Sequence, residues 1–87
     1  MQATVYSKIA CPQCDAAKQL LQRRNISYYE LLIGRDVTRE EVVAQFPNVR
    51  QVPIILVDGI FIGGLSELRS YLATLGEGEH NGNVLLG

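Results

Sequence analysis

The stretch Tyr6-Ser7-Lys8-Ile9-Ala10-Cys11-Pro12-Gln13-Cys14 decides how this chain folds. The residues up to Ser7 are β-branched or aromatic and stop before a Cys-Pro step, which predicts a strand at about residues 3–7. From Pro12 onward, apolar residues recur at helical spacing, and a proline suits the first turn of a helix. The two cysteines are therefore expected where a strand turns into a helix.

A second strand and a second helix follow this unit. Residues 27–33 have the pattern of a strand, which Gly34 stops. Thr38 and Glu41 form a capping-box pair, so a helix is expected from there to Phe46. A strand, a helix and a strand in succession imply a parallel pair with a right-handed crossover.

The last third of the chain predicts a hairpin and a third helix. Asp58-Gly59 separates two apolar runs, 54–57 and 60–62, and is a preferred pair for a two-residue hairpin turn. Ser66 is expected to be the N-cap of a last helix, which Gly76 would end. The predicted order of elements is βαβαββα, which belongs to the α/β class.

Composition fits one small domain with a tail. The chain has 87 residues, of which 47% are hydrophobic and 20% charged, as in globular proteins. We expect residues 1–76 to form the domain and the polar, glycine-rich residues 77–87 to form a flexible C-terminal tail. The formal net charge of −1 gives no reason to expect nucleic acid or a membrane surface as a partner, and we expect a monomer.

The N-terminus and the cysteines bear on the cellular compartment. No basic segment is followed by an apolar one, and no apolar run is long enough to span a bilayer. We therefore expect a cytoplasmic protein. Because thiols stay reduced in the cytoplasm, the two cysteines are expected to be reactive rather than a structural staple.

Cys11 has the features of a nucleophile. It is expected to face the unpaired amides and the positive dipole at the start of a helix, both of which favour a thiolate. Lys8 adds a cation that would lower the pKa of the Cys11 thiol below the free value of about 8.5. Cys14, one helical turn further in on the same face, is expected to be the resolving thiol.

Structural interpretations of the cysteine pair are a zinc half-site, an inert disulfide, or a docking module in which the cysteines are incidental. Zinc needs four ligands, whereas the chain has one histidine, His80, and no second cysteine pair. No metal is therefore expected.

Three motifs together resemble the signatures of dithiol glutaredoxins: Cys11-Pro12-Gln13-Cys14 with the strand before it, Gln51-Val52-Pro53, and Gly63-Gly64. The resemblance covers residues 3 to about 75, in the family's order and spacing. It implies a thioredoxin fold with a four-stranded mixed sheet flanked by helices. It also implies thiol–disulfide exchange with glutathione as the reducing co-substrate.

The resemblance places a glutathione site beside Cys11. In the family, a Val backbone before a cis proline pairs with the cysteinyl unit, a Gly-Gly loop holds the γ-glutamyl end, and a cation holds the glycyl carboxylate. The residues that this assigns to glutathione are Lys8, Gln13, Gln51, Val52, Pro53, Gly64, Leu65 and Ser66. Arg50 is an alternative second contact. A trans proline opening an edge strand, and glycines that merely permit close packing, are the structural alternatives.

The implied substrates are protein disulfides and glutathione mixed disulfides, with ribonucleotide reductase among the candidate acceptors. Gln13 departs from the family, which usually has Tyr there. It resembles instead the glutaredoxin-like thioredoxins that thioredoxin reductase reduces and that serve ribonucleotide reductase. A glutathione-ligated iron–sulfur carrier is a further alternative.

Overall fold

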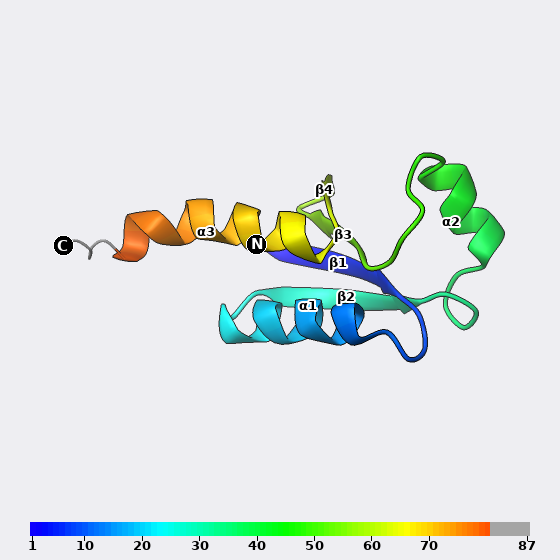
Figure 1. Cartoon of the computed structure of the whole chain (residues 1–87), viewed down its shortest axis with the longest axis horizontal. Helices are drawn as coiled ribbons and strands as arrows, with labels where there is room; N and C mark the ends of the chain where they lie inside the picture. Colours follow the sequence, from blue (N-terminus) through cyan, green and yellow to red (C-terminus); the bar gives the residue numbers. More distant parts are fainter. Residues whose placement is uncertain (81–87) are drawn as a thin grey trace.

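The computed structural model describes residues 1–80 and contains one sheet with three helices around it (Figure 1). The elements are β1 (Gln2–Ser7), α1 (Pro12–Arg23), β2 (Ser27–Leu32), α2 (Arg39–Gln45), β3 (Ile54–Val57), β4 (Ile60–Gly63) and α3 (Leu65–His80). This succession confirms the predicted order βαβαββα.

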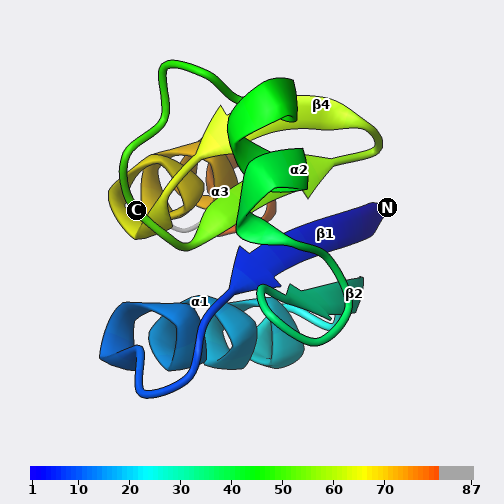
Figure 2. The same cartoon turned by 90° about the vertical axis from the view of Figure 1, so that its right-hand side faces the viewer.

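The sheet is mixed and has the strand order β2-β1-β3-β4 (Figure 2). β1 runs parallel to β2, with Val5 opposite Glu30, and antiparallel to β3, which pairs antiparallel with β4. The hairpin turns at Asp58 and Gly59, whose φ angles of 52° and 81° are those of a primed turn matching the twist of the strands. The four-stranded mixed sheet is as predicted.

Alternation along β1 sends side chains into two different cores. Ala3 and Val5 point to the face that α1 and α3 cover, and Tyr6 points to the face that α2 covers. The larger core consists of Ala3, Val5, Ala17, Leu21, Ile55, Val57, Leu68 and Leu72, each at most 2% exposed. Burial of each Leu or Val in it contributes about 1.5–3 kcal/mol to folding.

The smaller core holds α2 against the sheet beside the cysteines. Tyr6 meets Phe46 edge to face, with ring centroids 5.4 Å apart. The α2 helix begins with the predicted capping box: Thr38 Oγ1 accepts from Glu41 N–H, and Glu41 Oε1 accepts from Thr38 N–H. Local hydrogen bonds thus fix the start of α2, although the helix is only seven residues long.

The last helix differs from the prediction at both ends. It begins at Leu65, so Ser66 lies in its first turn and the N-cap prediction for Ser66 is wrong. Glu67 instead accepts the N–H of Gly64, at 2.9 Å, and so caps the helix from within. Gly76 does not stop it either, because α3 continues to His80, and an interior glycine costs a helix only about 1 kcal/mol.

The predicted tail lies mostly beyond the part of the chain that the structure describes. Residues 77–80 belong to α3, and residues 81–87, including the apolar Val84-Leu85-Leu86 segment, lie outside the described residues. The domain boundary at residue 76 stays a prediction. Within residues 1–80, no helix has both the length and the apolar character needed to cross a bilayer.

Candidate functional site

Cys11 is the N-cap of α1. Ala10 turns the chain with a φ of 58°, Cys11 is extended, and Pro12 occupies the first helical position, where its missing N–H costs nothing. The Sγ atom of Cys11 accepts a hydrogen bond from the N–H of Cys14 at 3.1 Å. A helix start that donates an amide to this sulfur stabilises negative charge on it.

The two cysteines form a disulfide, with their Cα atoms 5.2 Å apart. Cys11 is 7% exposed and Cys14 1% exposed, whereas Pro12 and Gln13 between them are exposed. A partner approaching from solvent therefore reaches the sulfur of Cys11 first, and Cys14 lies behind it.

Cys11 opens onto a groove of about 1120 Å³ between the β1–α1 loop and α2, which we call the α2 groove. Its lining contains three basic residues, Lys8, Arg39 and Arg50, and no acidic residue among those that the structure describes. Its apolar wall includes Ile33, Val42, Val49 and Ile54. The groove can accept an extended chain that carries negative charge.

A second groove, of about 800 Å³, lies beside the first and ends at the glycine pair; we call it the glycine-loop groove. The two grooves share Gln13 and the segment 49–52. The peptide bond between Val52 and Pro53 is cis, as predicted. Gly63, with a φ of 130°, turns the chain from β4 into α3 at the far end of this groove.

All eight residues assigned to glutathione line these grooves. Lys8 lines the α2 groove, and the residues lining the glycine-loop groove are Gln13, Gln51, Val52, Pro53, Gly64, Leu65 and Ser66. The structure thus brings together three motifs that lie up to fifty residues apart in sequence, and the ligand roles of these residues stay predictions.

Arg39 and Glu67 also line the grooves, and neither was among the residues that the sequence assigned to glutathione. Arg39 directly follows the N-cap of α2, and only the packing of α2 against Tyr6 brings it to the α2 groove with Lys8. Glu67 lies in the glycine-loop groove, where its carboxylate holds the Gly64 amide. An acidic residue in the first turn of the last helix was the one signal available for it.

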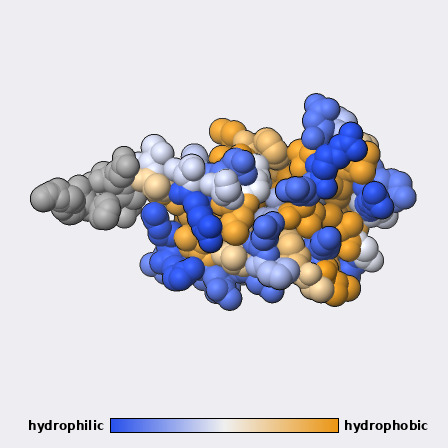
Figure 3. Space-filling view, viewed as in Figure 1, coloured by the Kyte–Doolittle hydropathy of each residue, from blue (hydrophilic) through white to orange (hydrophobic). Residues whose placement is uncertain are grey.

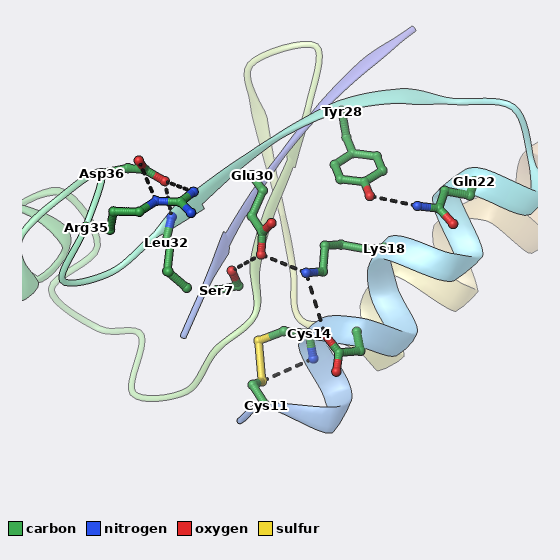
Figure 4. Close-up of polar contacts among 11 residues, drawn as sticks. Ser7, Cys11, Cys14, Lys18, Gln22, Tyr28, Glu30, Leu32, Arg35 and Asp36 are labelled. Carbon is green, nitrogen blue, oxygen red and sulfur yellow. Dashed lines mark hydrogen bonds and ion pairs between the residues drawn. A yellow bond between two sulfur atoms is a disulfide. The ribbon is translucent and has the colours of Figure 1, made fainter. Parts of the chain in front are cut away.

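A hydrogen-bonded charge cluster lies on the α1 side of the sheet, near the cysteines (Figure 4). One oxygen of Glu30, Oε2, accepts both the Ser7 hydroxyl at 2.6 Å and the Lys18 ammonium at 2.7 Å. The hydrogen bond from Lys18, followed by the one from Ser7, lowers the pKa of Glu30. The same contact raises the pKa of Lys18, so both groups are charged at neutral pH.

The surface of the molecule is mainly hydrophilic over α1 (Figure 3). Where the β1–α1 loop and α2 lie, Figure 3 shows an apolar area beside hydrophilic side chains. Ile9 and Val43 contribute to it with 77% and 51% of their surface exposed. A protein substrate that reaches Cys11 therefore meets apolar as well as basic side chains.

Comparison with known proteins supports a family assignment. Residues 3–62 match the family model described as glutaredoxin. The chain is 34% identical over 64 residues to glutaredoxin 3 of Escherichia coli K12, covering 74% of this chain and 77% of that protein. It is also 36% identical over 70 residues to the hybrid peroxiredoxin hyPrx5 of Haemophilus influenzae, a match that covers 80% of this chain but only 29% of that longer protein.

Solved structures agree with this assignment. Glutaredoxin 1 of Francisella tularensis, complexed with cacodylate, superposes with a TM-score of 0.74 at 26% identity, over 85% of this chain and 94% of that one. A buckwheat glutaredoxin–glutathione complex shares the fold, with a TM-score of 0.72 at 23% identity, over 83% of this chain and 68% of that one. The chain therefore belongs to the glutaredoxin family of the thioredoxin superfamily, and its Cys11–Cys14 pair makes it a thiol oxidoreductase.

Proposed function

We propose that this protein is a glutathione-dependent thiol–disulfide oxidoreductase that reduces protein disulfides and glutathione mixed disulfides. The observation that carries the proposal is the position of Cys11. It caps a helix and opens onto the α2 groove, which adjoins the glycine-loop groove, and the two grooves together are lined by every residue that the family resemblance assigns to glutathione. The proposal includes a cytoplasmic location, where reduced glutathione is available, and a monomeric state.

In the proposed reaction, the Cys11 thiolate attacks a sulfur of the substrate disulfide. A bond forms between Cys11 Sγ and that sulfur, and the other substrate sulfur leaves as a thiolate, which takes up a proton. With a protein disulfide, Cys14 then displaces the substrate from Cys11 and closes the internal disulfide. Two molecules of glutathione reopen that disulfide and leave as glutathione disulfide.

Glutathione fits the grooves as a short extended chain with a carboxylate at each end. The glycyl carboxylate would meet Lys8 and Arg39 in the α2 groove. The backbone of Val52 would pair with the cysteinyl unit as an added strand does. At the glycine loop, Glu67 already holds the Gly64 amide, so the first-turn amides of Leu65 and Ser66 would take the γ-glutamyl carboxylate.

The test is consumption of NADPH by the purified protein supplied with glutathione, glutathione reductase and a small glutathione mixed disulfide. We expect turnover, its loss in Cys11→Ser, and retained removal of glutathione in Cys14→Ser. Absence of turnover in a protein that still reacts with an alkylating agent at Cys11 would refute glutathione coupling. Activity that survives in Cys11→Ser would refute the proposed roles of the cysteines.

Gln13 favours a second candidate function, reduction by thioredoxin reductase with electron donation to ribonucleotide reductase. Gln13 is exposed and lines both grooves, where most of the family has an aromatic ring, so it alters the surface that any reductant must contact. A parallel assay with thioredoxin reductase in place of glutathione and its reductase separates the two functions. Turnover in that assay alone would select the second one.

A further inference from the structure

Ser7 is unusual for its burial. Among residues 1–75, whose side chains the structure describes, it is the one buried polar residue, at 1% exposure. A hydroxyl buried this deeply needs a partner, and Ser7 donates to Glu30 Oε2. Ser7 is also the last residue of β1, from which the chain runs directly into the loop that carries Cys11. The cluster of Ser7, Lys18 and Glu30 is therefore anchored at the base of the cysteine loop.

Lys18 lies on the same side of α1 as Cys14. The two residues are four positions apart, which places their side chains one above the other on a helix. Helical side chains lean toward the N-terminus, so the Lys18 side chain reaches back over the turn that carries Cys14. Its ammonium group also lies 3.6 Å from Asp15 Oδ1, an atom in the turn of Cys14, which is consistent with this direction.

The proposed function requires negative charge at Cys14. A thiol attacks a disulfide as its thiolate, and Cys14 is only 1% exposed, so water solvates that thiolate poorly. Burial without a compensating charge disfavours the ionised form. The N-terminus of α1 stabilises negative charge on Cys11 rather than on Cys14, because the amide of Cys14 donates to the sulfur of Cys11. The resolving thiol therefore needs another source of positive charge.

We propose that Lys18, held in place by Glu30 and through it by Ser7, stabilises the thiolate of Cys14 during the resolving step. This proposal rests on the role of Cys14 in the proposed function. Lys18 acts by its charge on Cys14, and Glu30 is a positioning residue that acts through Lys18. Glu30 keeps the flexible lysine side chain, 21% exposed, from extending into water.

The resolving step conserves protons and electrons. The thiol of Cys14 loses its proton to solvent, and the resulting thiolate attacks Cys11 Sγ in the mixed disulfide. The bond between Cys14 and Cys11 forms while the bond between Cys11 and the substrate sulfur breaks. The substrate leaves as a thiolate and takes a proton from solvent, so Cys14 is oxidised, the substrate sulfur is reduced, and Cys11 stays at the disulfide level. Lys18 exchanges no proton and acts only by its charge.

The charged groups around this cluster come from α1 and from the segment of β2 and its following loop. They are Lys18 and Asp15 on α1, Glu30 on β2, and Arg35 after β2, whose charge also lowers the pKa of Glu30. Lys8, at the entrance of the cysteine loop, is exposed and lines the α2 groove. Lys18 is thus the one cation on the inner side of α1 near Cys14 within the described residues.

The test is a stopped-flow reaction of the reduced protein with a symmetrical aromatic disulfide whose released thiolate is coloured. Attack by Cys11 releases the first equivalent, and attack by Cys14 on the mixed disulfide releases the second, so one trace reports both steps. Lys18→Gln removes the charge but keeps an amide that can donate to Glu30. We expect it to slow the second phase about tenfold at pH 7 and to raise the pH midpoint of that phase by about one unit.

The first phase should stay within about twofold in the same variant, because Cys11 is stabilised by the helix start. Lys18→Arg should restore most of the second phase. Arg23→Gln is the matched control, since it removes one positive charge from an exposed site at the far end of α1 and should leave both phases unchanged. An unchanged second phase in Lys18→Gln, or equal slowing of both phases, would overturn the proposal.

Glu30→Gln tests the positioning role separately. If Glu30 holds Lys18 near Cys14, its loss slows the second phase, although less than loss of the lysine does. Acceleration of that phase would mean that Glu30 acts only by repelling the thiolate, and the positioning role would be wrong. None of these reactions contains glutathione, so their outcome is independent of whether glutathione is the physiological reductant. A missing first phase would instead refute Cys11 as the nucleophile of the proposed function.

Discussion

Gly63 is the position at which a single methyl group should cost the most stability. Its φ of 130° lies outside the regions that residues with a side chain adopt, which costs about 1–3 kcal/mol. A Cβ atom there would also lie 2.8 Å from Glu67 Cγ and 2.9 Å from Glu67 Cβ. Those atoms form the base of the glutamate side chain, so the whole side chain must move.

Movement of Glu67 removes the cap on the Gly64 amide, a loss of about 1 kcal/mol. The free energy of unfolding of Gly63→Ala should therefore fall by about 2–4 kcal/mol in total. For a domain of this size, that corresponds to a decrease in Tm of at least about 8 °C.

Two other glycines allow the cost of the backbone conformation and the cost of the steric contact with Glu67 to be measured separately. Gly59 has a φ of 81°, but a Cβ atom added there would have no heavy atom within 4 Å, so Gly59→Ala should show the backbone cost alone, about 1–2 kcal/mol. Gly64→Ala brings a methyl group no closer than 3.5 Å to its neighbours, without a positive φ, and should cost less than about 1 kcal/mol. Urea denaturation of the three variants measures the order. A Gly63→Ala protein no less stable than Gly59→Ala would refute the steric argument.

Three further predictions concern charge and capping. Glu30→Gln should be less stable than the native protein at pH 7 by about 1 kcal/mol. Because the pKa of Glu30 is lowered in the folded protein, the carboxylate contributes to stability above its ordinary pKa of 4.5, and this contribution is lost as the pH falls through the folded pKa. The urea midpoints of the two proteins should therefore converge in acid. Lys8→Gln should raise the KM for a glutathione mixed disulfide about fivefold, and added salt should shrink the difference; a KM that does not move would remove Lys8 from the site. Thr38→Ala should cost about 1 kcal/mol of stability in thermal unfolding and leave the reactivity of Cys11 unchanged, and a protein as stable as the native one would show that the capping box contributes nothing.

The elements that sequence reasoning located correctly are those with strong local signals. Asp58-Gly59 has few conformations other than a primed turn, and the Thr38–Glu41 pair satisfies its own backbone amides wherever the helix packs. The spacing of Cys11 and Cys14 across a helix start likewise depends on the first turn alone. Such features need no knowledge of distant contacts.

The errors and omissions concern features that depend on tertiary contacts or on small energy differences. Ser66 is a good N-cap residue, but the helix starts two residues earlier, with Glu67 capping the amide of Gly64, because Gly63 and Gly64 leave room for its carboxylate. Gly76 does not end α3, since the cost of one glycine is too small to decide it. The joining of Ser7, Lys18 and Glu30 was missed because the three residues come from β1, α1 and β2 and meet only when the sheet forms.

Intact-protein mass spectrometry, with peptide mapping, of Cys14→Ser treated with glutathione disulfide tests whether glutathione binds at the junction of the two grooves. Amide NMR shifts of the same sample against the reduced protein locate the bound tripeptide. We expect one glutathionyl group, on Cys11, with shifts at Val52 and in the glycine loop at Gly64 and Leu65. A protein that forms no adduct, or an adduct on Cys11 with no shift in either groove, would contradict a glutathione site at the junction of the two grooves.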